Sequence, residues 1–186
     1  MLDAVEGDQK KNIVETLLQH CVISRALLTP EDAVFCAKYF ELLHSLGVDA
    51  FSSLQYFDRV VRDVFPAVFC ATDREAATLG IFLRETLSPL RRWRYNKEAY
   101  RTEASDKPGF ATAIGSTSRC SFEQFGAVFG KWYDKIFRMA KHCLENYRAH
   151  GRAGLIVLIK IVPVFPVLRK THAALVALVQ LSLIHI

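Results

Sequence analysis

The sequence predicts an all-α fold, on three observations. Apolar residues recur at intervals of three and four along nearly every segment, and no stretch alternates between apolar and polar residues as a half-buried strand does. Helix N-terminal signals stand at 29–32, 72–75 and 121–124. A hydrophobic fraction of 51% excludes a disordered chain. A domain built from helices therefore explains the pattern best.

The first two expected helices flank the sequence "TPED" at 29–32. Before it, Ile13, Leu17, Cys21 and Val22 are predicted to share one buried face. Thr29 supplies an N-cap and Pro30 a first helical residue, and the helix is expected to run to Leu46 and end at Gly47. Its polar stripe is narrow, so we expect it to be buried on two sides.

The next two expected helices lie on either side of Thr72. One begins after Ser52 or Ser53, with a kink expected at Pro66. The sequence "TDRE" at 72–75 is a capping box and opens the other. Ser88 and Pro89 are expected to interrupt that helix before a basic, aromatic continuation.

The longest expected helix follows the capping box "SFEQ" at 121–124 and persists to about His150. The most apolar stretch of the chain, 154–168, then predicts a helix that is kinked or split at Pro163 and Pro166. This stretch is too short and too interrupted for a membrane span, which needs roughly 20 apolar residues. A membrane-associated hairpin over 154–186 is the alternative to burial against other helices.

The spacing of the helix starts indicates a repeat architecture. Thr29 and Thr72 each open a helix, lie 43 residues apart and enclose one further helix. HEAT and armadillo repeats use two-helix units of roughly 40 to 47 residues. We therefore predict an α-solenoid of antiparallel helix pairs, HEAT/armadillo-like, over residues 1–181.

Composition and cysteine usage place the chain inside the cell. The net charge of +5 favours an anionic partner without requiring one. The five cysteines are far apart among apolar neighbours, as buried reduced thiols are. The first residues resemble neither a secretory signal nor a transit peptide, so cytoplasm or nucleus is expected.

The sequence predicts no enzyme. The metal-ligand residues His142 and Cys143 are adjacent on a helix and point in different directions. "GAVFGKW" at 126–132 lacks the spacing and the hydroxyl of a phosphate-binding loop and lies inside the longest helix. No nucleophile elbow occurs in the sequence. We expect no catalytic residues, metal, cofactor or small-molecule substrate.

One basic and aromatic stretch, 84–101, is a candidate for RNA binding, because cations attract phosphates and aromatic faces stack on bases. The candidate residues are Arg91, Arg92, Trp93, Arg94, Tyr95, Lys97 and Arg101. The alternative is a solvated helix face with Trp93 and Tyr100 in the core. A secondary basic face on the longest helix has the same two interpretations, and it comprises Lys131, Lys135, Arg138 and Lys141.

Several stretches, in one consistent order, resemble the THO complex subunit 2 family. They are "QHCVISRALLTPEDAVFCAKYFELLH" (19–44), "YFDRVVRDVF" (56–65), "ATLGIFLRETLSPLRRWRYNKEAY" (77–100), "PGF" (108–110), "FGKWYDKI" (129–136), "HCLE" (142–145) and "LIVLIKIVPVFPVL" (155–168). The resemblance covers roughly residues 13 to 170. Family members are far longer, so we interpret the chain as a fragment. Residues 182–186 fit poorly, and we interpret them as a non-native tail.

The resemblance implies a function as well as a fold. It implies a non-catalytic helical scaffold of the nuclear THO complex, which couples transcription to mRNA packaging and export. The implied partners are the other THO subunits and a DEAD-box RNA helicase, with RNA itself as a candidate partner and no membrane. A direct RNA-binding module that uses 84–101 is the alternative function.

Overall fold

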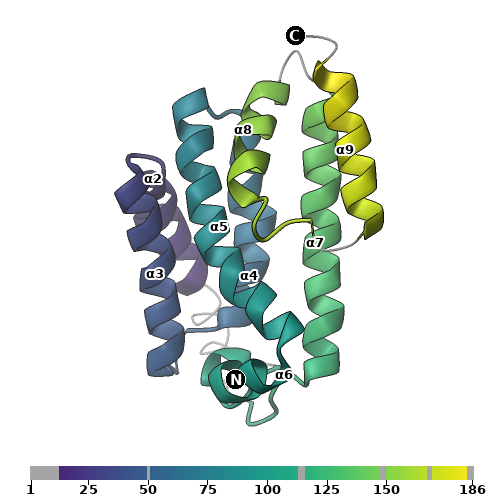
Figure 1. The fold of residues 1–186 in the computed structure, drawn as a ribbon. Helices are drawn as coiled ribbons and strands as arrows, with labels where there is room; N and C mark the ends of the chain where they lie inside the picture. Colours follow the sequence, from purple (N-terminus) through teal and green to yellow (C-terminus); the bar gives the residue numbers. More distant parts are fainter. Residues whose placement is uncertain (1–12, 50, 113–115, 147–149, 167–168, 184–186) are drawn as a thin grey trace, which may run out of the picture.

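The computed structural model describes residues 13–49, 51–112, 116–146, 150–166 and 169–183, and these residues are predominantly helical (Figure 1). The α-helices are α2 (Ser24–Ala26), α3 (Pro30–Leu46), α4 (Ser53–Arg59), α5 (Asp73–Tyr95), α6 (Lys97–Tyr100), α7 (Phe122–Glu145), α8 (Arg152–Ile161) and α9 (Arg169–Leu183). Wider π-helical turns form η1 (Leu18–Ile23), η2 (Val60–Val64) and η4 (Arg101–Ser105), and 3₁₀ turns form η3 (Phe65–Phe69) and η5 (Pro108–Phe110). The described residues contain no strand, so the all-α prediction is confirmed.

The predicted helix starts are confirmed atom by atom. The Thr29 hydroxyl accepts a hydrogen bond from the Asp32 N–H at 3.1 Å. Thr72 and Glu75 form a capping box, and so do Ser121 and Gln124. Each box satisfies backbone N–H groups that the first helical turn leaves without a partner. At the end of α3, Gly47 has φ 67°, the left-handed conformation that glycine adopts without a steric penalty.

Two predicted boundaries differ from the structure, and a third is confirmed. The expected interruption at Ser88 and Pro89 is wrong, because α5 continues through Pro89. The Pro89 ring is buried, and packing of α5 against its neighbours compensates for the missing N–H. α7 ends at Glu145, before the expected His150. At this end the Asn146 side chain donates a hydrogen bond to the His142 carbonyl at 2.9 Å. α8 ends at Ile161, ahead of Pro163, so the split of the apolar stretch is confirmed.

α5 is the central helix of the structure. It packs against α3 on one side and α8 on another and also contacts α7, and α7 in turn packs against α8 and α9. In Figure 1, α3 and α9 lie at opposite edges with α5 and α7 between them. α5 and α8 approach each other closely at Gly80, where an added Cβ would stand 2.7 Å from the Lys160 Cβ. α8 therefore crosses α5 with almost no space between the two backbones.

The buried core joins all of these helices and is rich in aromatic rings. Phe40 of α3 stacks on Tyr56 of α4 with ring centroids 4.2 Å apart. Phe125 of α7 stacks on Tyr100 of α6 at 5.0 Å. Such pairs are stabilising beyond the area that they bury. The aromatic residues spread through the sequence thus form one continuous core.

Three expectations about burial are wrong in part. In the first helical segment Val14, Leu18, Val22 and Ala26 are buried, a spacing of four that the wider turns of η1 keep in phase. Ile13 and Cys21, expected on that buried face, are exposed. Cys70 is also exposed, whereas Cys36, Cys120 and Cys143 are buried as expected.

The expected burial of α3 on two sides is the third error. The inner side of α3 is buried against α5 and α4 through Ala33, Cys36, Ala37, Phe40 and His44, but its outer side exposes large apolar side chains.

None of the described helices is both long and apolar enough to cross a membrane. The arrangement as repeated antiparallel pairs stays a prediction, and residues 184–186 of the predicted tail lie outside the described residues.

Candidate interaction surface

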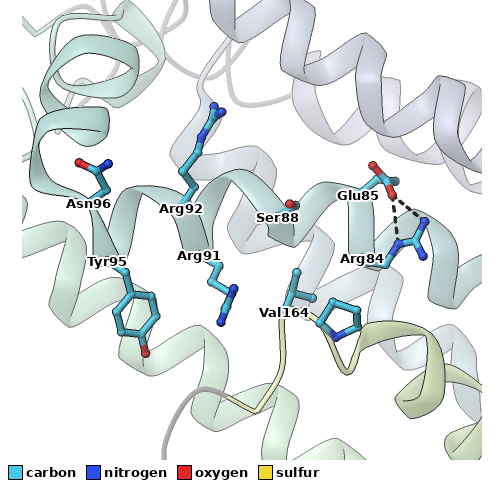
Figure 2. A pocket seen from close by; sticks show the side chains of 9 residues that line it. Arg84, Glu85, Ser88, Arg91, Arg92, Tyr95, Asn96 and Val164 are labelled. Carbon is cyan, nitrogen blue, oxygen red and sulfur yellow. Dashed lines mark hydrogen bonds and ion pairs between the residues drawn. The ribbon is translucent and has the colours of Figure 1, made fainter.

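The C-terminal half of α5 forms one wall of an open groove of about 680 Å³ (Figure 2). Its other wall is the turn after α8. The groove is lined by Arg84, Glu85, Ser88, Arg91, Arg92, Tyr95, Asn96, Pro163 and Val164. Three arginines on one helix give it a positive potential, which favours an anionic ligand.

Arg91 and Tyr95 are the groove residues best placed to contact a ligand. They are four residues apart, and Figure 2 shows them extending from the same side of α5. The Arg91 guanidinium lies 5.9 Å from the Tyr95 ring centroid, and the Tyr95 side chain is 60% exposed. Arg91 makes no hydrogen bond or ion pair with any residue that the structure describes. Its charge is therefore available for a phosphate or carboxylate.

Two other groove arginines are already paired with carboxylates. Arg84 Nη2 lies 2.9 Å from Glu85 Oε1, and Arg92 donates to Glu103 Oε2. In Figure 2 Arg92 points away from Arg91. Each pair is partly exposed, so it reduces the local positive potential while contributing little stability.

Trp93 and Tyr100 belong to the core and not to the surface. The Trp93 indole N–H donates to Glu103 Oε2 at 2.8 Å, and its ring packs on His44 at 5.1 Å between centroids. The Tyr100 hydroxyl donates to the Cys120 carbonyl at 2.6 Å. Neither ring has a face free to stack on a base. Trp93 is thus removed from the candidate RNA-binding residues.

His44 completes the network around Trp93. Its Nε2 lies 2.9 Å from the Glu103 carbonyl oxygen, and its Nδ1 lies 2.8 Å from the Ser53 hydroxyl. Because a carbonyl only accepts, Nε2 carries the proton and Nδ1 accepts from Ser53. Burial lowers the pKa of His44 below its usual value, so this neutral form is favoured.

The remaining candidate residues lie beyond the groove. The Arg94 guanidinium and the Lys97 ammonium stand 5.9 and 5.7 Å from the Phe122 ring centroid at the start of α7. Arg101 is exposed and pairs with Glu98 at 2.8 Å. Arg91, Arg92 and Tyr95 line the groove. Arg94 and Lys97 lie next to it, because the Arg94 guanidinium also stands 6.0 Å from the Tyr95 ring centroid.

The secondary basic face lies on the solvent side of α7, but it is partly neutralised. Arg138 pairs with Asp134 at 3.0 Å, and Lys141 pairs with Glu145 at 3.5 Å. Lys131 is exposed and Lys135 is half-buried. Alternating charges at this spacing are typical of a solvated helix face.

The buried thiols lack the properties of nucleophiles. Burial raises the pKa of Cys143 to about 11, and it raises the pKa of Cys36 and of Cys120 as well. A thiol with a raised pKa stays protonated at neutral pH, and the thiolate is the reactive form. Within the described ranges, no three His, Cys, Asp or Glu side chains gather closely enough to hold a metal ion.

Sequence reasoning missed the contributions to this surface that come from distant segments. Pro163 and Val164 form the second wall, and Glu103 ties Arg92 to Trp93. The sequence carries no signal for these contacts, because they depend on how α8 and η4 pack against α5. Sequence spacing could identify only the shared side of Arg91 and Tyr95, which are four residues apart.

Comparison with known proteins gives a consistent result. Residues 3–182 match the family model described as Transcription factor/nuclear export subunit protein 2. The chain is 37% identical to THO complex subunit 2 of Arabidopsis thaliana over 158 residues, which are 83% of this chain and 9% of that relative. It is 34% identical to THO complex subunit 2 of Homo sapiens over 166 residues, 84% of this chain and 10% of that relative.

A more distant relative is THO complex subunit 2 of Saccharomyces cerevisiae, 29% identical over 94 residues, which are 50% of this chain and 6% of that relative. No solved structure matches the chain significantly. The chain spans about a tenth of the length of the plant and human relatives. Because the family model covers nearly the whole chain, the chain belongs to the Tho2 family.

Proposed function

We propose that this chain is part of a non-catalytic helical scaffold in the nuclear THO complex, which couples transcription to mRNA packaging and export. Its helices belong to a longer α-solenoid of antiparallel pairs that includes residues 1–181, with residues 182–186 outside the repeats. The partners are the other THO subunits and a DEAD-box RNA helicase. Family membership supports a place in the THO complex.

The observation that carries the proposal is the presence of uncovered apolar surface at both edges of the structure. At one edge the outer side of α3 is apolar and exposed. Toward the other, α8, the turn that follows it and α9 expose Ile159, Val162, Val176 and Leu181. Exposed apolar surface of this extent marks contacts with other protein. A stack of helices that continues on both sides produces this distribution, since each helix pair buries its apolar faces against the next.

The proposal is tested in a THO complex reconstituted with full-length protein that carries this segment. Ile159→Asp together with Val162→Asp places charge on the exposed apolar side of α8. We expect several-fold lower recovery of the other THO subunits, with RNA affinity unchanged. Lys141→Glu, on the solvated face of α7, is the matched control and leaves recovery unchanged. Full recovery of the subunits with the α8 variant would contradict the scaffold.

A second candidate function is direct RNA binding, and the available Arg91 beside the exposed Tyr95 favours it. Binding of single-stranded RNA by this groove predicts that Arg91→Gln lowers RNA affinity and reduces the salt dependence by about 0.7 units of logarithmic slope, one phosphate contact. Tyr95→Ala would remove about 1–3 kcal/mol of base stacking. Arg101→Gln is the control, because Arg101 lies outside the groove. The scaffold alone predicts that none of these changes alters RNA affinity.

A further inference from the structure

The outer side of α3, together with Leu28 in the turn before it, carries a line of exposed apolar side chains, which we call the α3 stripe: Leu28, Phe35, Tyr39, Leu42 and Leu46. Their exposed fractions range from 40% to 67%. On α3 the spacing is four, three and four residues, the pattern of a helix that packs lengthwise against another helix. The Phe35 and Tyr39 rings are stacked at 6.4 Å and give the stripe a flat aromatic centre.

Two of the charges that border the α3 stripe are already paired within the chain, whereas Glu31, four residues before Phe35, is exposed and makes no ion pair with any residue that the structure describes. Lys38 lies 2.8 Å from Glu41, and Arg25 lies 2.7 Å from Asp32. The Arg25 guanidinium also covers one end of the stripe, 4.4 Å from the Phe35 ring centroid. An occupant is therefore held mainly by apolar burial, with Glu31 as one charge at the N-terminal end of the stripe. Permanent interfaces have this character, whereas interfaces with separate, exchanging partners are steered by charge.

The position of the stripe indicates where its occupant comes from. α3 and α9 are the two edges of the row of helices in Figure 1, and apolar side chains are exposed on both. About nine tenths of the length of the plant and human relatives lies outside the matched segment. A family chain of that length has enough further residues to extend the row at this edge.

We propose that the α3 stripe is covered by an amphipathic α-helix from the same polypeptide, from the part of the family chain outside these 186 residues. The covering helix presents apolar residues at the same intervals of three and four and lies nearly parallel or antiparallel to α3. This inference rests on the proposed helical scaffold and adds the identity of the contact at one of its edges.

Site-specific photo-crosslinking in the full-length protein, within the reconstituted complex, tests the inference. A benzophenone-bearing phenylalanine analogue replaces Phe35 in one variant and Leu42 in another, and it replaces Lys131 on the solvated face of α7 as the control. Mass spectrometry identifies the linked peptides. We expect Phe35 and Leu42 to link to one segment of the same polypeptide outside residues 1–186, at positions three, four or seven residues apart. Their yield should be several-fold above that of Lys131.

Three results would overturn the inference and are distinguishable from failure of the scaffold. Linkage to another THO subunit would refute the intramolecular helix while leaving the scaffold intact. Linkage to a second copy, identified by mixing isotopically labelled and unlabelled protein, would also refute it. A yield no higher than that at Lys131 shows an open stripe and refutes it as well.

A matched pair of substitutions provides a second measurement. Leu42→Asp in the full-length protein should increase the rate of limited proteolysis several-fold in the segment linked to Phe35, since it inserts a charge into the apolar contact. Ser45→Asp, one turn away and beside the stripe, should leave that rate unchanged. Equal rates for both variants would show that the segment does not depend on the stripe.

Discussion

α3 and α7 begin in the same way and differ in what they present to the outside. Each is capped by a hydroxyl that accepts an N–H in the first turn, and each buries one side in the common core. The outer side of α7 carries charges that pair along the helix. The outer side of α3 carries the apolar stripe. The charged side is built to face water, and the apolar side is built to face protein.

The strongest test of this difference compares inner and outer positions on both helices. Phe40→Ala on α3 and Trp132→Ala on α7 remove fully buried rings, and each should lower the free energy of unfolding by about 3–5 kcal/mol. In the 186-residue chain, Leu42→Ala and Lys131→Ala should each change it by about 0.5 kcal/mol or less, because both side chains are exposed there. Urea unfolding followed by circular dichroism measures all four. A cost for Leu42→Ala as large as that for Phe40→Ala would show that the stripe is already covered.

Two glycines compare a closed helix contact with an open helix surface. Gly80→Ala would force apart α5 and α8, and we expect destabilisation by about 1–3 kcal/mol. Gly130 lies on the outer part of α7, and apart from its own helix backbone no atom of the described residues comes within 4 Å of an added Cβ. Gly130→Ala should stabilise the protein by about 0.5–1 kcal/mol, because alanine favours the helix. Thermal unfolding of both variants shows whether each substitution raises or lowers the stability. A destabilised Gly130→Ala variant would contradict an open α7 surface.

The N-caps of α3 and α7 should contribute equally to the stability of the protein. Thr29→Ala and Ser121→Ala each leave a first-turn N–H without its partner, and each should cost about 1 kcal/mol. Ser88→Ala on the exposed side of α5 is the control, with an expected change of about 0.5 kcal/mol or less. Chemical denaturation midpoints measure the three variants. A markedly larger loss for one cap would show that the helix starts are not equivalent.

The inner side of α3, unlike that of α7, contains a buried histidine that makes stability depend on pH. The lowered pKa of His44 means that the unfolded chain binds the proton more tightly than the folded one. The stability that neutral His44 contributes is complete above the unfolded-state pKa of about 6.5, and it is lost progressively as the pH falls below that value. As the pH is lowered, the midpoint of urea unfolding should therefore decline more steeply for the natural sequence than for His44→Gln. Parallel curves would contradict the assignment.

Local chemistry was predictable from the sequence, and tertiary contacts were not. The caps at Thr29, Thr72 and Ser121 depend on a few adjacent residues and were identified correctly. The passage of α5 through Pro89 was not, because packing of the surrounding helices outweighs a local signal. Cys21 is exposed and not buried as predicted, because the wide turns of η1 change which residues face the core, and residue spacing does not reveal such turns.

The candidate surface shows the same division. The charge of the 84–101 stretch was evident, as was the alternative that Trp93 and Tyr100 belong to the core, which the structure confirms. The pairing of Arg92 with Glu103, and the second wall from Pro163 and Val164, bring together residues distant in sequence. No spacing rule connects such positions.

One oxygen of Glu103 receives both the guanidinium of Arg92, which faces solvent, and the indole of Trp93, which is buried. An anion that draws Arg92 away leaves that oxygen to the indole alone and changes the electric field along the ring. Trp93 is one of two tryptophans in the chain. Its fluorescence, read in a Trp132→Phe background, should consequently report an anion that separates Arg92 from Glu103.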